Sequence, residues 1–139
     1  MRIAVFFIVM STILCACEEA PHEHDQATST APAETAKPGL IHNVYFWLRK
    51  DITLEEKTAF MEGARSLGQI ESVQAFYMGP HANTESRAVV DHSYDLSLII
   101  QFEDQAAQDA YQVDSIHTAF SDQFSTVWSE VKVYDVAIE

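Results

Sequence analysis

The chain has 139 residues, and its 21 acidic residues far outnumber its 8 Lys and Arg residues, which gives a net charge of −13. Such an acidic chain is unsuited to nucleic-acid binding, because the phosphate backbone is held by basic surface. Its two cysteines, Cys15 and Cys17, both stand near the first residue. The rest of the chain therefore excludes thiol catalysis, disulfides and cysteine metal sites.

Residues 1–16 are predicted to form a lipoprotein signal peptide. Arg2 supplies a positive start, and the apolar run after it is shorter than the roughly 20 residues of a membrane-spanning helix. The segment Leu14-Cys15-Ala16-Cys17 resembles a bacterial lipobox. We therefore expect acylated Cys17 to anchor the chain to a membrane of the bacterial cell envelope, on its periplasmic or outer-surface side. A short anchor helix, or a signal peptide cleaved elsewhere, is the alternative.

Residues 17–38 are predicted to be a disordered tether. After Cys17 the segment contains no large apolar residue, so it cannot bury enough surface to offset the entropy of ordering. The run His22-Glu23-His24-Asp25 offers metal-binding side chains, but a chain without preformed geometry binds metal weakly. We interpret this run as part of the polar tether.

Residues 39–139 are predicted to form one domain, and its 16 acidic and 6 basic residues also argue against adhesion to anionic lipid by the domain itself. Leu40 to Leu48 is rich in β-branched and aromatic residues, so it predicts a strand with His42 among the apolar residues of one face. The other face carries Tyr45 and Trp47. A single layer of helices covers one face of a sheet, so the second face predicts a partner subunit.

The later elements follow from capping residues and hydrophobic periodicity. They are a helix from a Thr53–Glu56 capping box to a stop at Gly68, a strand over 73–78, a loop over 81–92, a strand over 94–102, a helix capped by Asp104 that ends at Tyr111, a helical piece capped by Ser115 that carries Ile116, Phe120, Phe124, Val127 and Trp128, and a strand over 131–138. Tyr94 is expected on the same face of its strand as Leu96. The order β-α-β-β-α-β predicts an α+β, ferredoxin-like fold with a four-stranded antiparallel sheet.

Residues 40–138 resemble the stress-responsive α/β-barrel (Dabb) domain family. The matching features are His42 in the first strand, Gly79 after the second, Tyr94-Asp95 before the third, Phe102-Glu103-Asp104 before a helix, Tyr111, and the run from Ile116 to Phe120. The resemblance implies a homodimer in which two sheets face each other and close an α/β barrel.

The resemblance also implies candidate site residues. The family includes the plant enzyme olivetolic acid cyclase, which closes a polyketide by an aldol reaction with a Tyr and a His. Tyr111 and His117 match that pair at the same spacing, and His42 matches the first-strand His. The cyclase has a further His on its third strand, where this chain has Leu96.

Each of these side chains also has a structural interpretation. His117 is either a general base oriented by Tyr111 or an imidazole bonded to a backbone carbonyl. His42 is either a pocket residue or a buried His bonded to a neighbour. His42, His117 and Asp114 lack the spacing of a known metal motif, so we expect neither metal nor cofactor. Asn43 and Trp47 superficially match related monooxygenases but lie on the face opposite His42.

Three functions remain open from the sequence. The leading one is a lipid-anchored dimer that binds a small, largely apolar molecule. The second is a cofactor-free lyase or cyclase that uses Tyr111 and His117. The third is a structural dimer within an envelope complex. A cavity that reaches both Tyr111 and His117 favours the first two, whereas a filled interior favours the third.

Overall fold

The structure is a computed structural model that describes residues 37–139. The predicted signal peptide, the lipidation site at Cys17 and nearly all of the predicted tether lie outside the described residues. Within residues 37–139, no helix is both long and apolar enough to cross a membrane.

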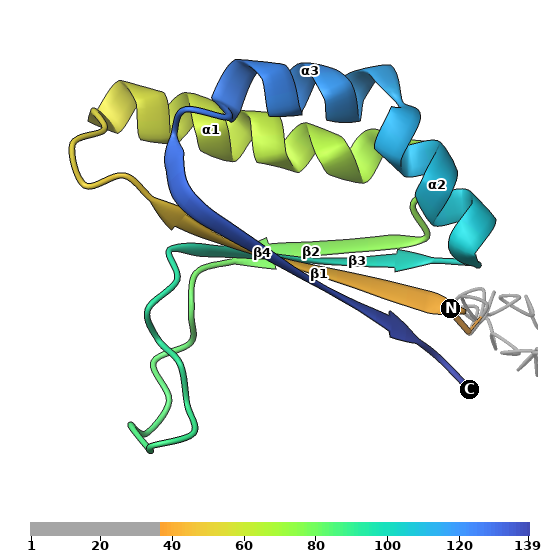
Figure 1. The fold of residues 1–139 in the computed structure, drawn as a ribbon, viewed down its shortest axis with the longest axis horizontal. Helices are drawn as coiled ribbons and strands as arrows, with labels where there is room; N and C mark the ends of the chain where they lie inside the picture. Colours follow the sequence, from red (N-terminus) through yellow and green to blue (C-terminus); the bar gives the residue numbers. More distant parts are fainter. Residues whose placement is uncertain (1–36) are drawn as a thin grey trace, which may run out of the picture. The chain divides into compact units, whose positions relative to one another are not determined.

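The domain has two layers, a four-stranded antiparallel sheet and helices on one of its faces (Figure 1). The sheet order is β2-β3-β1-β4, so β2 and β4 are its edge strands. The elements in chain order are β1 (Leu40–Leu48), α1 (Leu54–Ser66), the short 3-10 helix η1 (Leu67–Gln69), β2 (Ala75–Gly79), β3 (Leu96–Phe102), α2 (Gln105–Val113), α3 (Ser115–Phe124) and β4 (Trp128–Ala137). The predicted α+β, ferredoxin-like fold is confirmed.

The core lies between the helices and the sheet, as the alternation of β1 predicts. Val44, Phe46 and Leu48 point toward the helices and are buried, and so is His42. From the neighbouring strand, Leu96, Leu98, Ile100 and Phe102 are all buried. Buried residues of the helices complete the core: Phe60, Ala64, Tyr111, Phe120 and Phe124.

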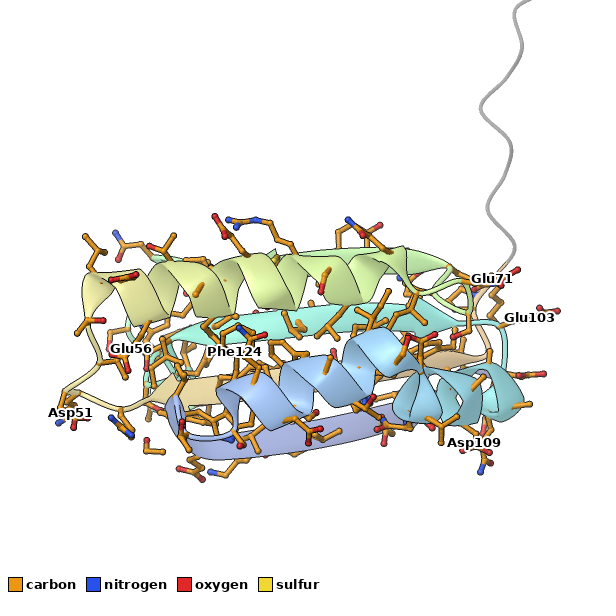
Figure 2. All side chains as sticks on the ribbon, turned by 90° about the horizontal axis from the view of Figure 1, so that it is seen from above. Asp51, Glu56, Glu71, Glu103, Asp109 and Phe124 are labelled. Carbon is orange, nitrogen blue, oxygen red and sulfur yellow. The ribbon has the colours of Figure 1, made fainter. Side chains whose placement is uncertain are left out.

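Two glycines set how closely the helices approach their neighbours. A β-carbon at Gly63 of α1 would clash with the ring of Phe124, which lies between α1 and α3 in Figure 2. A β-carbon at Gly68 would stand 2.8 Å from the ring of Phe76. Because no glycine among residues 37–139 has positive φ, the predicted helix stop at Gly68 has a different cause. Gly68 gives the ring of Phe76 room and is not a left-handed cap.

The capping residues correct one prediction and confirm two. Thr53 and Glu56 form the expected capping box, and the Asp104 side chain accepts the Ala107 N–H. Ser115 does not cap α3. Asp114 does, because its side chain accepts the Ile116 N–H at 2.7 Å and its extended backbone separates α2 from α3.

Two boundaries were also predicted wrongly. Trp128 begins β4 and is not part of a helix, because α3 ends at Phe124. Tyr94 lies outside β3, and its ring packs against that of Tyr45 on the opposite face of the sheet, with 5.0 Å between the ring centroids. The reason is Asp95, whose side chain accepts the Leu48 N–H at 2.8 Å and so replaces a ladder partner.

The face of the sheet that carries no helices is largely apolar and exposed, as expected. We call it the open face. The exposed fractions of Tyr77, Ile99 and Tyr134 are 58 %, 38 % and 57 %. Residues 80–95, between β2 and β3, extend from the sheet on the side away from the helices (Figure 1). The covering of this face by a partner stays a prediction.

Candidate functional site

A cavity of about 170 Å³ lies between the helices and the sheet. It is lined by His42, Val44, Phe46, Leu67, Leu98, Tyr111, Gln112, His117, Phe120, Ser121, Trp128, Val131 and Val133. The three residues that the sequence singles out, His42, Tyr111 and His117, therefore meet in one cavity. Most of the other lining side chains are apolar.

The bend at Asp114 brings Tyr111 and His117 together. Tyr111 lies in the last turn of α2, and His117 lies in the first turn of α3. Asp114 ends one helix, with its N–H donating to the Tyr111 carbonyl, and caps the next. As a result, the ring centroids of Tyr111 and His117 lie 4.7 Å apart, and those of Tyr111 and His42 lie 6.0 Å apart.

His42 has a partner that the sequence analysis did not identify. Its Nδ1 lies 2.6 Å from Oδ1 of Asp135, which stands directly across the β1–β4 ladder. Since a carboxylate oxygen accepts, Nδ1 carries the hydrogen, and in the neutral ring Nε2 holds the lone pair. Val131, Val133 and Asp135 stand at alternate positions of β4 and share one face. An acidic residue on an otherwise apolar face is the sequence feature that could have indicated a buried partner for Asp135.

His117 is oriented by a backbone carbonyl. Its Nδ1 lies 3.1 Å from the carbonyl oxygen of Gln112, which can only accept, so Nδ1 donates and Nε2 is free. Burial lowers the pKa of His117, and the charge of His42 lowers it further, while the Gln112 carbonyl and Asp114 act in the opposite direction. This hydrogen bond to a backbone carbonyl is expected of a structural His. It is equally compatible with a general base, because it fixes the orientation of the ring.

Tyr111 is the most enclosed polar side chain of the cavity, with 1 % of its surface exposed. Burial raises the pKa of its phenol well above the ordinary value. The hydroxyl therefore stays protonated near neutral pH and can donate a hydrogen bond. The phenol can donate a hydrogen bond to a carbonyl group of a ligand. A neutral imidazole beside it can accept a proton from the carbon next to that carbonyl.

Leu96 stands at the position where the cyclase has a further His, and it belongs to the core. It is fully buried and does not line the cavity.

The candidate metal ligand Asp114 has another role, since its carboxylate caps α3. Among residues 37–139, no three His, Cys, Asp or Glu side chains are grouped so that they could share a metal ion.

Larger hollows lie elsewhere on the domain. One of about 740 Å³ lies at the end of β1 beside Arg49, Lys50 and Lys57. Another, of about 570 Å³, lies on the open face beside Tyr45 and Trp47. Neither hollow contains His42, Tyr111 or His117, so the smaller cavity is the candidate site.

Comparison with known proteins gives a consistent result. The family model described as Stress responsive A/B Barrel Domain matches residues 40–138. Curated proteins give no match to the sequence. Among solved structures, a Dabb family protein with a ferredoxin-like fold from Mesorhizobium loti has 22 % identity and a TM-score of 0.59, and the match covers 72 % of this chain and 96 % of that one.

Two further solved structures share the fold. A dimeric ferredoxin-like protein of unknown function from Thermobifida fusca has 14 % identity and a TM-score of 0.61, with 77 % of this chain and 97 % of that one covered. Hydroxynitrile lyase from Passiflora edulis has 14 % identity and a TM-score of 0.62, with 74 % and 96 % covered. At these identities the likeness shows the fold alone.

Proposed function

The chain belongs to the stress-responsive A/B barrel (Dabb) domain family, and we propose that it is a lipid-anchored homodimer that binds a small, largely apolar molecule. The observation that carries the proposal is the cavity of about 170 Å³ in which His42, Tyr111 and His117 meet among apolar walls. A mostly apolar pocket with a few convergent polar groups is typical of a small-molecule site. A cavity that reaches both Tyr111 and His117 also favours binding over a purely structural dimer.

The polar groups suit a ligand that carries a carbonyl or hydroxyl group. The Tyr111 phenol donates, and the Nε2 atom of neutral His117 accepts. The apolar walls, among them Val44, Leu98 and Phe120, would surround the remainder of the molecule.

The homodimer is supported by the open face and by the dimeric neighbours. Tyr77, Ile99 and Tyr134 expose apolar surface on a face that this domain's own helices leave bare. Such a patch marks an interaction site, and two-fold packing would use the same patch on both subunits. The protein from Thermobifida fusca is described as dimeric.

Anchoring is supported by the Leu14-Cys15-Ala16-Cys17 segment. Replacing Cys17 with Ser should release the chain from membranes or block its processing. A variant that is cleaved normally and stays membrane-bound would contradict the anchor.

The binding proposal is tested by native mass spectrometry of the purified chain. A small molecule should co-purify with the unmodified chain and be lost or reduced in His117→Ala. The thermal melting of the same variant is the control, because a structural His117 would cost about 1–3 kcal/mol of stability when its partner is left unpaired. A large loss of stability with the molecule retained would contradict the proposal.

A second function, a cofactor-free lyase or cyclase, is favoured by the closeness of Tyr111 and His117, whose ring centroids lie 4.7 Å apart. The two groups would remove a proton beside a carbonyl and stabilise the resulting enolate. Acetophenone in D2O tests this step, because enolisation exchanges its methyl protons for deuterium. Exchange should be accelerated by the chain and lost in both Tyr111→Phe and His117→Gln. Exchange at the rate of buffer would exclude this function for simple ketones.

A further inference from the structure

Residues 80–95, which we call the arm, form a defined projection. They leave the sheet at Gly79, return at Leu96, and extend on the side opposite the helices (Figure 1). A turn closes the tip of the arm, where the Val90 N–H donates to the Arg87 carbonyl at 2.9 Å. Val89 lies in this turn, and 89 % of its surface is exposed. An apolar side chain is thus presented at the end of the arm.

The base of the arm is fixed to the open face. The Trp47 Nε1–H donates to Ser93 Oγ at 2.9 Å, and the Tyr94 ring packs against that of Tyr45. Its two limbs are also joined, since Thr84 Oγ1 lies 3.1 Å from Nε2 of His92. The direction of the arm is therefore set before any partner binds.

The candidate cavity is incomplete on one side. Its border is β4, an edge strand, and the side chains of Val131 and Val133 line the cavity there. These two residues pair with the buried Phe46 and Val44, yet they are 42 % and 47 % exposed. The apolar rim beside β4 is left uncovered by the helices of its own protomer.

We propose that the arm of each protomer closes the cavity of its partner, with Val89 packed on the partner's Val131 and Val133. This inference rests on the proposed homodimer and on the proposed binding cavity. It makes the site a property of the dimer, because each cavity is sealed from water only by the other chain. A site closed in this way would enclose a small apolar molecule.

The dimensions allow this arrangement. Facing sheets pack about 10 Å apart. The limb from Val89 to Ser93, where the bond from Trp47 holds the arm, can span about 13 Å at 3.3 Å per residue. The arm can therefore pass the partner's sheet and reach the edge of its cavity. A two-fold axis parallel to the strands is required, because it places β2, from which the arm leaves, beside the partner's β4.

The test uses cysteine pairs placed on different copies of the full chain. Two full-length chains with different epitope tags are co-expressed, one with Val89→Cys and the other with Val133→Cys, and a short bismaleimide is added to the membranes. The unmodified chain, which contains only Cys15 and Cys17, controls for linkage through those residues. Ile99→Cys on the open face reports the dimer itself, and Glu71→Cys reports an axis perpendicular to the strands.

The proposal predicts a covalent pair between the Val89→Cys and Val133→Cys chains. It also predicts that Val133→Cys reacts with a bulky maleimide roughly threefold to tenfold faster when Val89→Asp is added, because the apolar contact that covers it is lost. If Ile99→Cys chains are linked but the arm pair is not, the dimer stands and the arm proposal is overturned. Linkage of the Val89→Cys chain to a Glu71→Cys chain also overturns the arm proposal, because it indicates an axis perpendicular to the strands. If Ile99→Cys chains also fail to link, the proposed dimer falls with it.

Discussion

The Nδ1 atom of His42 lies 2.6 Å from the carboxylate of Asp135, across the ladder between β1 and β4. Only 6 % of the His42 side chain is exposed, whereas 49 % of the Asp135 side chain is. The imidazole therefore depends on Asp135 for a hydrogen bond that solvent supplies poorly. The pair fixes which ring nitrogen can face a ligand, and it ties the edge strand β4 to the site.

Replacing Asp135 with Ala should destabilise residues 37–139 by about 1–3 kcal/mol, because a buried donor loses its acceptor. The matched variant Asp135→Asn should cost much less, since the amide oxygen can still accept from Nδ1. Urea unfolding of both variants measures the difference. Equal loss in the two variants would mean that the hydrogen bond is not what Asp135 contributes.

His117 should make stability fall at acid pH. Its pKa is lowered in the folded chain by burial, so the unfolded chain binds the proton more tightly. The folded state therefore loses stability as the pH falls through the ordinary value of about 6.5. Between pH 7.5 and 5.5, the free energy of unfolding of the unmodified chain should decrease more than that of His117→Gln. A smaller decrease in the unmodified chain would contradict the direction of the shift.

Gly68 and Gly79 form a matched pair of substitution sites. A β-carbon at Gly68 would stand 2.8 Å from the Phe76 ring, whereas one at Gly79 would meet nothing within 4 Å. Gly68→Ala should therefore destabilise the domain by about 1–3 kcal/mol through overpacking. Gly79→Ala should be close to neutral. Thermal melting of both variants checks this, and an unaffected Gly68→Ala would show that Phe76 moves freely.

The homodimer predicts a defect from a charge on the open face. Ile99 is 38 % exposed there, and Ile99→Asp would place a carboxylate in the buried interface, at a high desolvation cost. Sedimentation velocity should show a dimer for residues 37–139 and a monomer or aggregate for the variant. Leu54→Asp, at an exposed position of α1, is the control and should remain dimeric. A monomeric unmodified domain at micromolar concentration would contradict the dimer.

The sequence predicts the faces of β1 well, because period-two alternation is a local property of a strand. The pairing of His42 with Asp135 is not local. It depends on the register between β1 and β4, which brings together two residues 93 positions apart in the chain, and a slip of one residue would turn Asp135 to the other face. His42, Tyr111 and His117 are placed in the site by the family resemblance, whereas the pairing of Asp135 with His42 depends on the strand register.

The wrongly predicted element boundaries also result from tertiary contacts. Helical spacing in the sequence continues from Phe120 and Phe124 to Val127 and Trp128. The last two residues lie beyond the end of α3 and still pack in the core. Hydrophobic spacing reports which residues are buried and does not fix where a helix stops. Tyr94 suits a strand by its β propensity, yet the contact of Asp95 with Leu48 moves it to the open face.

The central claim is that one cavity, reaching His42, Tyr111 and His117, binds a small apolar molecule with a carbonyl or hydroxyl group. Its most direct test is an NMR titration of residues 37–139 with acetophenone, which joins an apolar ring to a carbonyl acceptor. The ring signals of His42, Tyr111 and His117 should shift together and saturate, while the methyl signals of Leu54, exposed on α1, should not move. Shifts that do not saturate, or that miss these three rings, would contradict the claim.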